Sequence, residues 1–389
     1  MGLPSALLRP GLIALGLLAA GCGGEPERDP ASPSTGPEAE PGGPPAAAAE
    51  VVDDRDPAAV HRWFLSEEEV ARLYPLDMPG MQYDPYTYLR RKANARFRYE
   101  FPEHPDGELF FVTNSSHLRM DGEVSAEKPD LRILVTGDSH TDGVCNNDES
   151  FAGLLESSLA SSSPGRTVEV LNAGHGSYTF YNYYGVLLKF LPLEPDVFVV
   201  GVYGGNDFAE ALFPWHHFRG SSFVEVGEEY DARVEAAVAL DPPEGAAAVH
   251  QGFNQLVYFQ HRHRQAELSL QAAGEVFGAV EELCAAHGVR LVVLYIPPPA
   301  DVQPELFGDL FDRVADTLGL ADYARVYGDT LADRLLDSLA ARGVEVVDGR
   351  AVFAGRDELV YWRLDHHVNL RGHALLAEAL RERLADLAR

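Results

Sequence analysis

A Gly-Asp-Ser segment, residues 137–139, directly follows the apolar run 132–136 (RILVT). Such a run, rich in branched side chains and bounded by Gly and Asp, predicts a buried strand. Ligands of open α/β sheets bind at the carboxyl ends of the strands, where a turn into a helix exposes a Ser hydroxyl. We therefore predict that Ser139 is a nucleophile, although such a string alone also suits an ordinary turn.

An acid and a histidine near the C-terminus could activate this serine. Asp365 precedes His367 by two residues in the segment 364–373 (LDHHVNLRGH). On extended backbone these side chains project to the same side, so that Asp365 could hold the Nδ1–H of His367 while Nε2 faces Ser139. The alternative is a polar helix start with incidental histidines.

Two further segments could supply an oxyanion hole. The segments 172–178 (NAGHGSY) and 204–207 (GGND) follow the next two apolar runs. Both bring small residues and backbone N–H groups to the sheet edge expected for Ser139, and Asn206 adds a side-chain amide donor. Either segment alone could instead be a tight turn.

The other polar candidates have structural interpretations. His140, next to Ser139, could contact substrate, but a His at a helix start is expected to be solvated. Asp138 and Asp207 are expected to bind loop backbone. The pairs His216-His217 and His261/His263 do not share a helix face and lack partners at metal-ligand spacing. The sequence therefore predicts no metal and no cofactor.

Strands and helices alternate in the part of the chain that carries these residues. The predicted strands are 132–136, 168–171, 197–202, 290–295 and 344–347, and the predicted helices include 149–160, 265–287 and 372–387. Near-continuous apolar strands between helices predict an α/β fold, a three-layer α/β/α sandwich with a five-stranded parallel sheet.

The remaining segments predict the domain organisation. Residues 1–21 are a predicted signal peptide, because their apolar run of 12–20 is too short to span a bilayer. Residues 22–50 form a tether rich in Pro, Ala, Gly and Glu, 51–130 an extension packed on the main domain, and 131–389 the main domain. Its insertion at about 208–263 is rich in aromatic residues, which could wall a substrate pocket or pack on the sheet.

The sequence LAAGC at 18–22 resembles a bacterial lipoprotein box, which implies lipidation of Cys22 and an exported, envelope-anchored protein; an ordinary secretory signal is the alternative. Cys145 and Cys284 are then either two buried thiols or a disulfide. The net charge of −29 argues against a nucleic-acid partner.

Taken together, the blocks GDS, NAGHGS, GGND and DHHVN resemble, in this order, those of the SGNH (GDSL) hydrolase family, from residue 132 to the C-terminus. The resemblance implies the flavodoxin-like fold of that family and a serine hydrolase with Ser139, His367 and Asp365 as its triad. It also implies an oxyanion hole of the Ser139 N–H, Asn206 and a third donor, which the alignment leaves open between Ser177 and Gly176.

The acid stands two residues before the His rather than the usual three, as in SGNH-like proteins that handle acetyl groups on exopolysaccharides. The expected function is therefore cleavage of small acyl esters through an acyl-enzyme, including O-acetyl groups on carbohydrate. Two alternatives remain: an O-acyltransferase acting on envelope or exopolysaccharide sugars, and a non-catalytic lipoprotein that binds glycan or lipid.

Overall fold

The computed structural model describes residues 55–74, 80–223, 262–303 and 323–387, apart from Leu364, together with a few positions between 255 and 319. The predicted signal peptide, Cys22 and the tether lie outside the described residues, as does most of the predicted insertion after residue 223. Among the described helices, none has the length and apolarity needed to cross a membrane.

The centre of the fold is a five-stranded parallel sheet with the strand order β6-β5-β7-β8-β9. Each of the five predicted strands is present, within two residues at either end. Their bounds are β5 (Leu131–Gly137), β6 (Val168–Asn172), β7 (Val197–Tyr203), β8 (Arg290–Ile296) and β9 (Glu345–Asp348).

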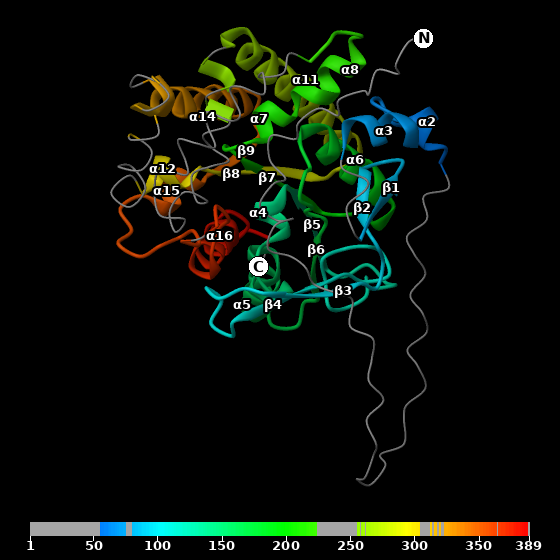
Figure 1. The fold of residues 1–389 in the computed structure, drawn as a ribbon. Coiled ribbons are helices and arrows are strands. Elements are labelled where there is room, and N and C mark those ends of the chain that lie inside the picture. The colour runs from blue at the N-terminus through cyan, green and yellow to red at the C-terminus, as the bar shows by residue number, and fades with distance from the viewer. Residues whose placement is uncertain are drawn as a thin grey trace, which may run out of the picture.

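Helices cover both faces of this sheet (Figure 1). Along β5, Leu134 packs with helices α6 (Phe180–Phe190) and α11 (His263–His287). Its neighbours Ile133 and Val135 pack on the other face with α5 (Phe151–Ser162) and α16 (Leu370–Arg383). This alternation of buried side chains is what a sheet between two helical layers requires.

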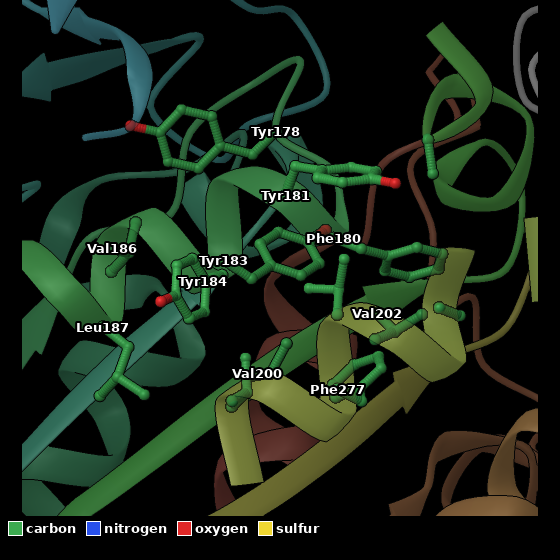
Figure 2. Packing of buried hydrophobic residues seen from close by; sticks show 14 of the residues in the cluster. Tyr178, Phe180, Tyr181, Tyr183, Tyr184, Val186, Leu187, Val200, Val202 and Phe277 are labelled. Atoms are coloured by element: carbon green, nitrogen blue, oxygen red, sulfur yellow. The ribbon is translucent and has the colours of Figure 1, made fainter. Parts of the chain in front are cut away.

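Figure 2 shows the first of these two layers, in which aromatic rings of α6 lie between the sheet and α11. Phe180 and Tyr183 approach Val200 and Val202 of β7, and the ring of Phe277 stands 5.8 Å from that of Phe180. The predicted α/β/α sandwich is confirmed.

The segment before β5 forms two antiparallel hairpins and short helices. β1 (Met81–Asp84) pairs with β2 (Tyr88–Arg91), and β3 (Arg96–Glu100) pairs with β4 (Glu108–Val112). The helices are α2 (Pro57–Val60) and α3 (Glu67–Leu73). We refer to residues 55–130 as the N-terminal extension.

Other helices, most of them short, lie in the described part of the chain. They are α4 (Ser139–Asp142), η1 (Asn147–Glu149), η2 (Leu191–Leu193), α7 (Asp207–Glu210), α8 (Leu212–Phe218), α12 (Pro299–Val302), α14 (Tyr323–Ala341) and α15 (Gly349–Phe353). The last helix ends at Arg383 rather than at the predicted 387, although Leu384 is still fully buried beyond it.

Candidate active site

Ser139 is the first residue of α4, at the carboxyl end of β5, which lies between β6 and β7 in the sheet. The preceding Asp138 caps the helix, because its Oδ1 accepts a hydrogen bond of 2.9 Å from the N–H of His140. A Cβ on Gly137 would lie 2.0 Å from the Thr141 hydroxyl and 2.7 Å from the Gly201 carbonyl. Only glycine therefore lets α4 pack this closely on β5 and β7.

His367 lies between Ser139 and Asp365. Its Nε2 is 2.7 Å from the hydroxyl oxygen of Ser139, and its Nδ1 contacts Asp365 Oδ1. The side chain of His367 is 1% exposed and that of Asp365 21%. The structure thus brings together the three residues proposed from the sequence, in the order that serine activation requires.

A tight loop carries Asp365 and His367. Its ends are joined by an antiparallel bridge between Tyr361 and Val368, and the side-chain amide of Asn369 donates to the Tyr361 carbonyl at 3.0 Å. The expectation of extended backbone is wrong here, because residues 365–367 form a bend. Asp365 Oδ1 accepts from the His367 N–H at 2.8 Å, so the bend itself places the acid beside the ring.

The two titratable groups of this loop stabilise each other's charge. Burial alone lowers the pKa of His367, but the Asp365 carboxylate and its hydrogen bond raise it above its ordinary value of 6.5. Burial alone raises the pKa of Asp365, but the charge and hydrogen bonds of His367 hold it well below 3.8. Asp365 is therefore ionised at neutral pH and favours a positively charged His367.

The segment after β6 approaches Ser139 through Gly176. A Cβ on Gly176 would lie 3.7 Å from Ser139 Cβ, and Ser177 beside it has a positive φ of 72°. Within the described residues, neither backbone N–H donates a hydrogen bond to another protein group. Both remain candidates for the middle oxyanion donor.

Asn206 follows β7, the neighbour of β5 in the sheet, and precedes α7. Its side-chain amide donates to Glu210 Oε1 at 3.0 Å. Since an amide nitrogen carries two hydrogens, one remains for an oxyanion.

Glu210 was not identified from the sequence, although its spacing of four residues from Asn206 is a usable signal. Burial raises the pKa of Glu210 to about 8, and the nearby Asp138 also raises it. The group that holds the Asn206 amide is therefore a neutral acid at pH 7.

Asp138 and Asp207 bind backbone, as expected. Asp207 Oδ2 accepts from the Tyr203 N–H at 3.0 Å and from the Tyr183 hydroxyl at 2.7 Å. Burial raises the pKa of Asp138 to about 7 and that of Asp207 well above its usual range. Both carboxyls are fully buried near the site, where they resist ionisation together.

The prediction that His140 is solvated is wrong. Its side chain is fully buried, and its ring stacks on Tyr203 with centroids 3.6 Å apart. His140 follows Ser139 directly, so the approach of α4 to the sheet carries its ring into the interior. Burial lowers its pKa well below 6.5, which keeps the ring neutral.

The N-terminal extension holds the segment after the nucleophile. Arg91 and Arg119 both bind the buried carboxylate of Asp142, the last residue of α4. Arg119 also donates to the carbonyls of Gly143 at 3.1 Å and Cys145 at 2.6 Å. Arg119, 20 residues before Ser139, thus holds the turn that follows α4.

The extension also braces the loop of Asp365 and His367. The ring of Phe101 stands 5.1 Å from Trp362, and the Trp362 N–H donates to the His367 carbonyl at 3.0 Å. Glu103 accepts from the N–H of Arg363 at 3.0 Å. Both sides of the Ser139–His367 contact therefore rest on this segment.

The remaining candidates have structural roles. His216 engages Ser221 at 2.8 Å and Gln265 at 2.9 Å through its two ring nitrogens, which leaves neither for a metal. His261 lies outside the described residues. Cys145 and Cys284 are buried free thiols, so the disulfide alternative is wrong.

In the predicted insertion, Phe208 and Trp215 are buried in the core, and the ring of Phe208 packs on Phe180 at 5.6 Å. This part of the insertion packs on the sheet layer. The pocket-wall interpretation stays a prediction.

The fold and this arrangement define an α/β/α hydrolase of the SGNH type. A family model described as the GDSL-like lipase/acylhydrolase family matches residues 135–375, more than half of the chain. The chain belongs to this family and is an ester hydrolase.

A search of curated proteins finds no match. Among solved structures, the chain is similar to an α/β hydrolase from the metagenome of Lake Arreo, Spain, at 16% identity, with 66% of this chain and 96% of that one covered and a TM-score of 0.36. It is similar to a catalytic mutant of an acetylxylan esterase from Geobacillus stearothermophilus at 12% identity, 65% and 94% coverage and a TM-score of 0.39. A third similar structure is the native aryl esterase of M. smegmatis, at 17% identity, 66% and 99% coverage and a TM-score of 0.36.

Proposed function

We propose that the protein cleaves small acyl esters through an acyl-enzyme on Ser139. His367 takes the hydroxyl proton as Ser139 attacks the ester carbonyl, and then gives this proton to the leaving alcohol. Water, activated by the same His367, releases the acid. The observation that carries this proposal is the 2.7 Å contact of His367 Nε2 with the Ser139 hydroxyl, beside an ionised Asp365.

The oxyanion of the tetrahedral intermediate accepts hydrogen bonds from the Ser139 N–H, the Asn206 amide and the N–H of Gly176 or Ser177. Glu210 supports this arrangement, because a neutral acid orients the Asn206 amide without placing a negative charge beside the oxyanion.

The deciding experiment is labelling of the full chain with a fluorophosphonate probe, which reacts with activated serines. We expect labelling of the wild type and none of Ser139→Ala, with equal circular dichroism spectra. A folded wild type that stays unlabelled would contradict the proposal and favour a non-catalytic protein that binds glycan or lipid.

O-acetyl groups on carbohydrate are the substrate class that we favour, and the support is the Asp365-x-His367 spacing. Rates with nitrophenyl acetate, butyrate and octanoate, followed by acetate release from acetylated sugars, test this choice. A labelled acetyl donor supplied with a sugar acceptor separates hydrolysis from O-acyl transfer, because only transfer labels the sugar.

We further propose that the protein is exported and anchored to the cell envelope through lipid on Cys22. The support is the sequence LAAGC at 18–22 after a short apolar run. Cys22→Ser should move the protein from the membrane fraction to the soluble fraction, and an unchanged distribution would contradict the anchor.

A further inference from the structure

The two ring nitrogens of His140 are buried without a visible hydrogen-bond partner among the described residues. Its side chain is 0% exposed, and neither ring nitrogen has a hydrogen-bond partner in the part of the chain that the structure describes. A neutral imidazole has one donor and one acceptor, and burying either of them without a partner destabilises the folded protein. A native protein rarely leaves such groups without a partner, so we expect that these nitrogens bind a ligand.

Two more histidine rings surround the same point. One nitrogen from each of His140, His366 and His367 lies within 4.8 Å of the other two. The ring centroids are 4.1 Å apart for His366 and His367, 4.8 Å for His140 and His367, and 5.9 Å for His140 and His366. Three imidazoles on one tetrahedral metal, with bonds of about 2.0–2.1 Å, place their rings at about 5 Å from one another.

The surroundings suit a cation. Asp365 contacts the Nδ1 of His367, which leaves Nε2 as the ligand atom and is the carboxylate–histidine arrangement that orients many zinc ligands. Asp138 is fully buried nearby, and its Oδ2 has no hydrogen-bond partner in the described chain.

We propose that His140, His366 and His367 form an inhibitory binding site for a divalent transition-metal ion, of which Zn²⁺ is the test case. The metal takes the lone pair of His367 Nε2, and the hydrogen bond from the Ser139 hydroxyl to this atom is lost. His367 then cannot accept the serine proton, so metal binding and nucleophile activation exclude each other. A side-chain rotation of His366, which is 9% exposed, closes the site around the ion.

This site was missed in the sequence because its members do not form a local ligand pattern. His366 and His367 are adjacent, and His140 lies more than 200 residues before them. The parallel sheet brings the two segments together. The metal binding itself does not depend on the proposed function, and only its inhibitory effect rests on that function.

Equilibrium dialysis of the full chain against Zn²⁺ tests the binding. We expect the wild type to bind one ion that His366→Gln binds about 10-fold more weakly or not at all. The control His287→Gln removes an exposed histidine at the end of α11 and should bind as the wild type does. His140→Gln is a second test of the site if its circular dichroism spectrum matches the wild type. Equal Zn²⁺ binding by wild type and His366→Gln would overturn the proposal.

Fluorophosphonate labelling with and without Zn²⁺ tests the inhibition. The labelling of each protein with Zn²⁺ is compared with the labelling of the same protein without Zn²⁺. We expect Zn²⁺ to suppress labelling of the wild type and of His287→Gln at concentrations that do not change the labelling of His366→Gln. If the wild type never labels, the proposed function fails, while the dialysis result still decides the metal site. Suppression that is equal in all three proteins would contradict the assignment to these histidines.

Discussion

The Nε of Arg119 lies 3.2 Å from Oδ1 of Asp142, and the two side chains are 1% and 3% exposed. Asp142 ends the one-turn helix that begins with Ser139, whereas Arg119 belongs to the N-terminal extension. The segment that bears the nucleophile is therefore held by a buried ion pair with a part of the chain outside the family-matched region.

Replacing Arg119 by Met should destabilise the protein strongly. Removal of one partner from a buried ion pair costs about 3–5 kcal/mol. Asp142 keeps Arg91 here, but the carbonyls of Gly143 and Cys145 also lose the donor that Arg119 supplies, so we expect a loss of about 3 kcal/mol. Urea unfolding at pH 7 measures this loss. The control is Arg98→Ala, since Arg98 pairs with Glu108 at the surface and its loss should cost under about 1 kcal/mol. Equal costs for the two variants would refute the structural role of Arg119.

Asp365→Asn should lower kcat by about 10⁴-fold, because an amide at this position favours the wrong His367 tautomer. The Asp365 charge also raises the pKa of His367, against the effect of burial. In Asp365→Asn, His367 should therefore lose its proton at a lower pH, and the residual activity should appear at a lower pH than in the wild type. The pH profile of kcat/KM measures this shift. An acidic side of the profile at the same pH in both proteins would contradict the interaction of Asp365 with His367.

Asn206→Ala should lower kcat by about 10²–10³-fold with little change in KM, as expected for a donor that acts on the transition state. Kinetics on the best ester of the chain-length series provide the measurement. A mainly raised KM would instead assign Asn206 to substrate binding.

Glu210→Gln should change the alkaline side of the pH profile. Burial raises the pKa of Glu210 to about 8, and the carboxylate of Asp138 contributes to this rise. Above pH 8 the ionised Glu210 opposes an oxyanion held by Asn206, so wild-type kcat/KM should fall there. Glu210→Gln should keep its activity, and an identical decline in both proteins would exclude Glu210 as its cause.

The same group affects stability in a defined direction. The pKa of Glu210 is raised on folding from an ordinary 4.5 to about 8. Its contribution is fully present below pH 4.5 and is lost as the pH rises through 8, because the unfolded chain releases the proton first. The free energy of unfolding of Glu210→Gln should fall less between these pH values than that of the wild type.

The sheet and the Ser139–His367 contact were predictable from the sequence, and the supporting residues were not. Strands such as 197–202 are apolar runs with few other interpretations. In a parallel sheet the polar blocks that follow these strands meet at the same edge. The burial of Arg119 could not be predicted, because most of its partners, from Asp142 to Asn147, lie 23–28 residues away along the chain. The prediction that His140 is solvated failed because it used only the position of His140 at a helix start, and this position does not show how closely α4 packs on β5.

The ion pairs between the N-terminal extension and α4 also limit how far the chain can be truncated from its N-terminal side. A fragment that begins at Leu131 would keep all the family blocks, yet it would bury Asp142 without either of its two arginines. Trp362, on the opposite side of the site, would lose the aromatic cover of Phe101. The shortest fragment that keeps the hydrolase folded should therefore begin before β1. A relative that loses the extension should also have lost Asp142 or gained another partner for it.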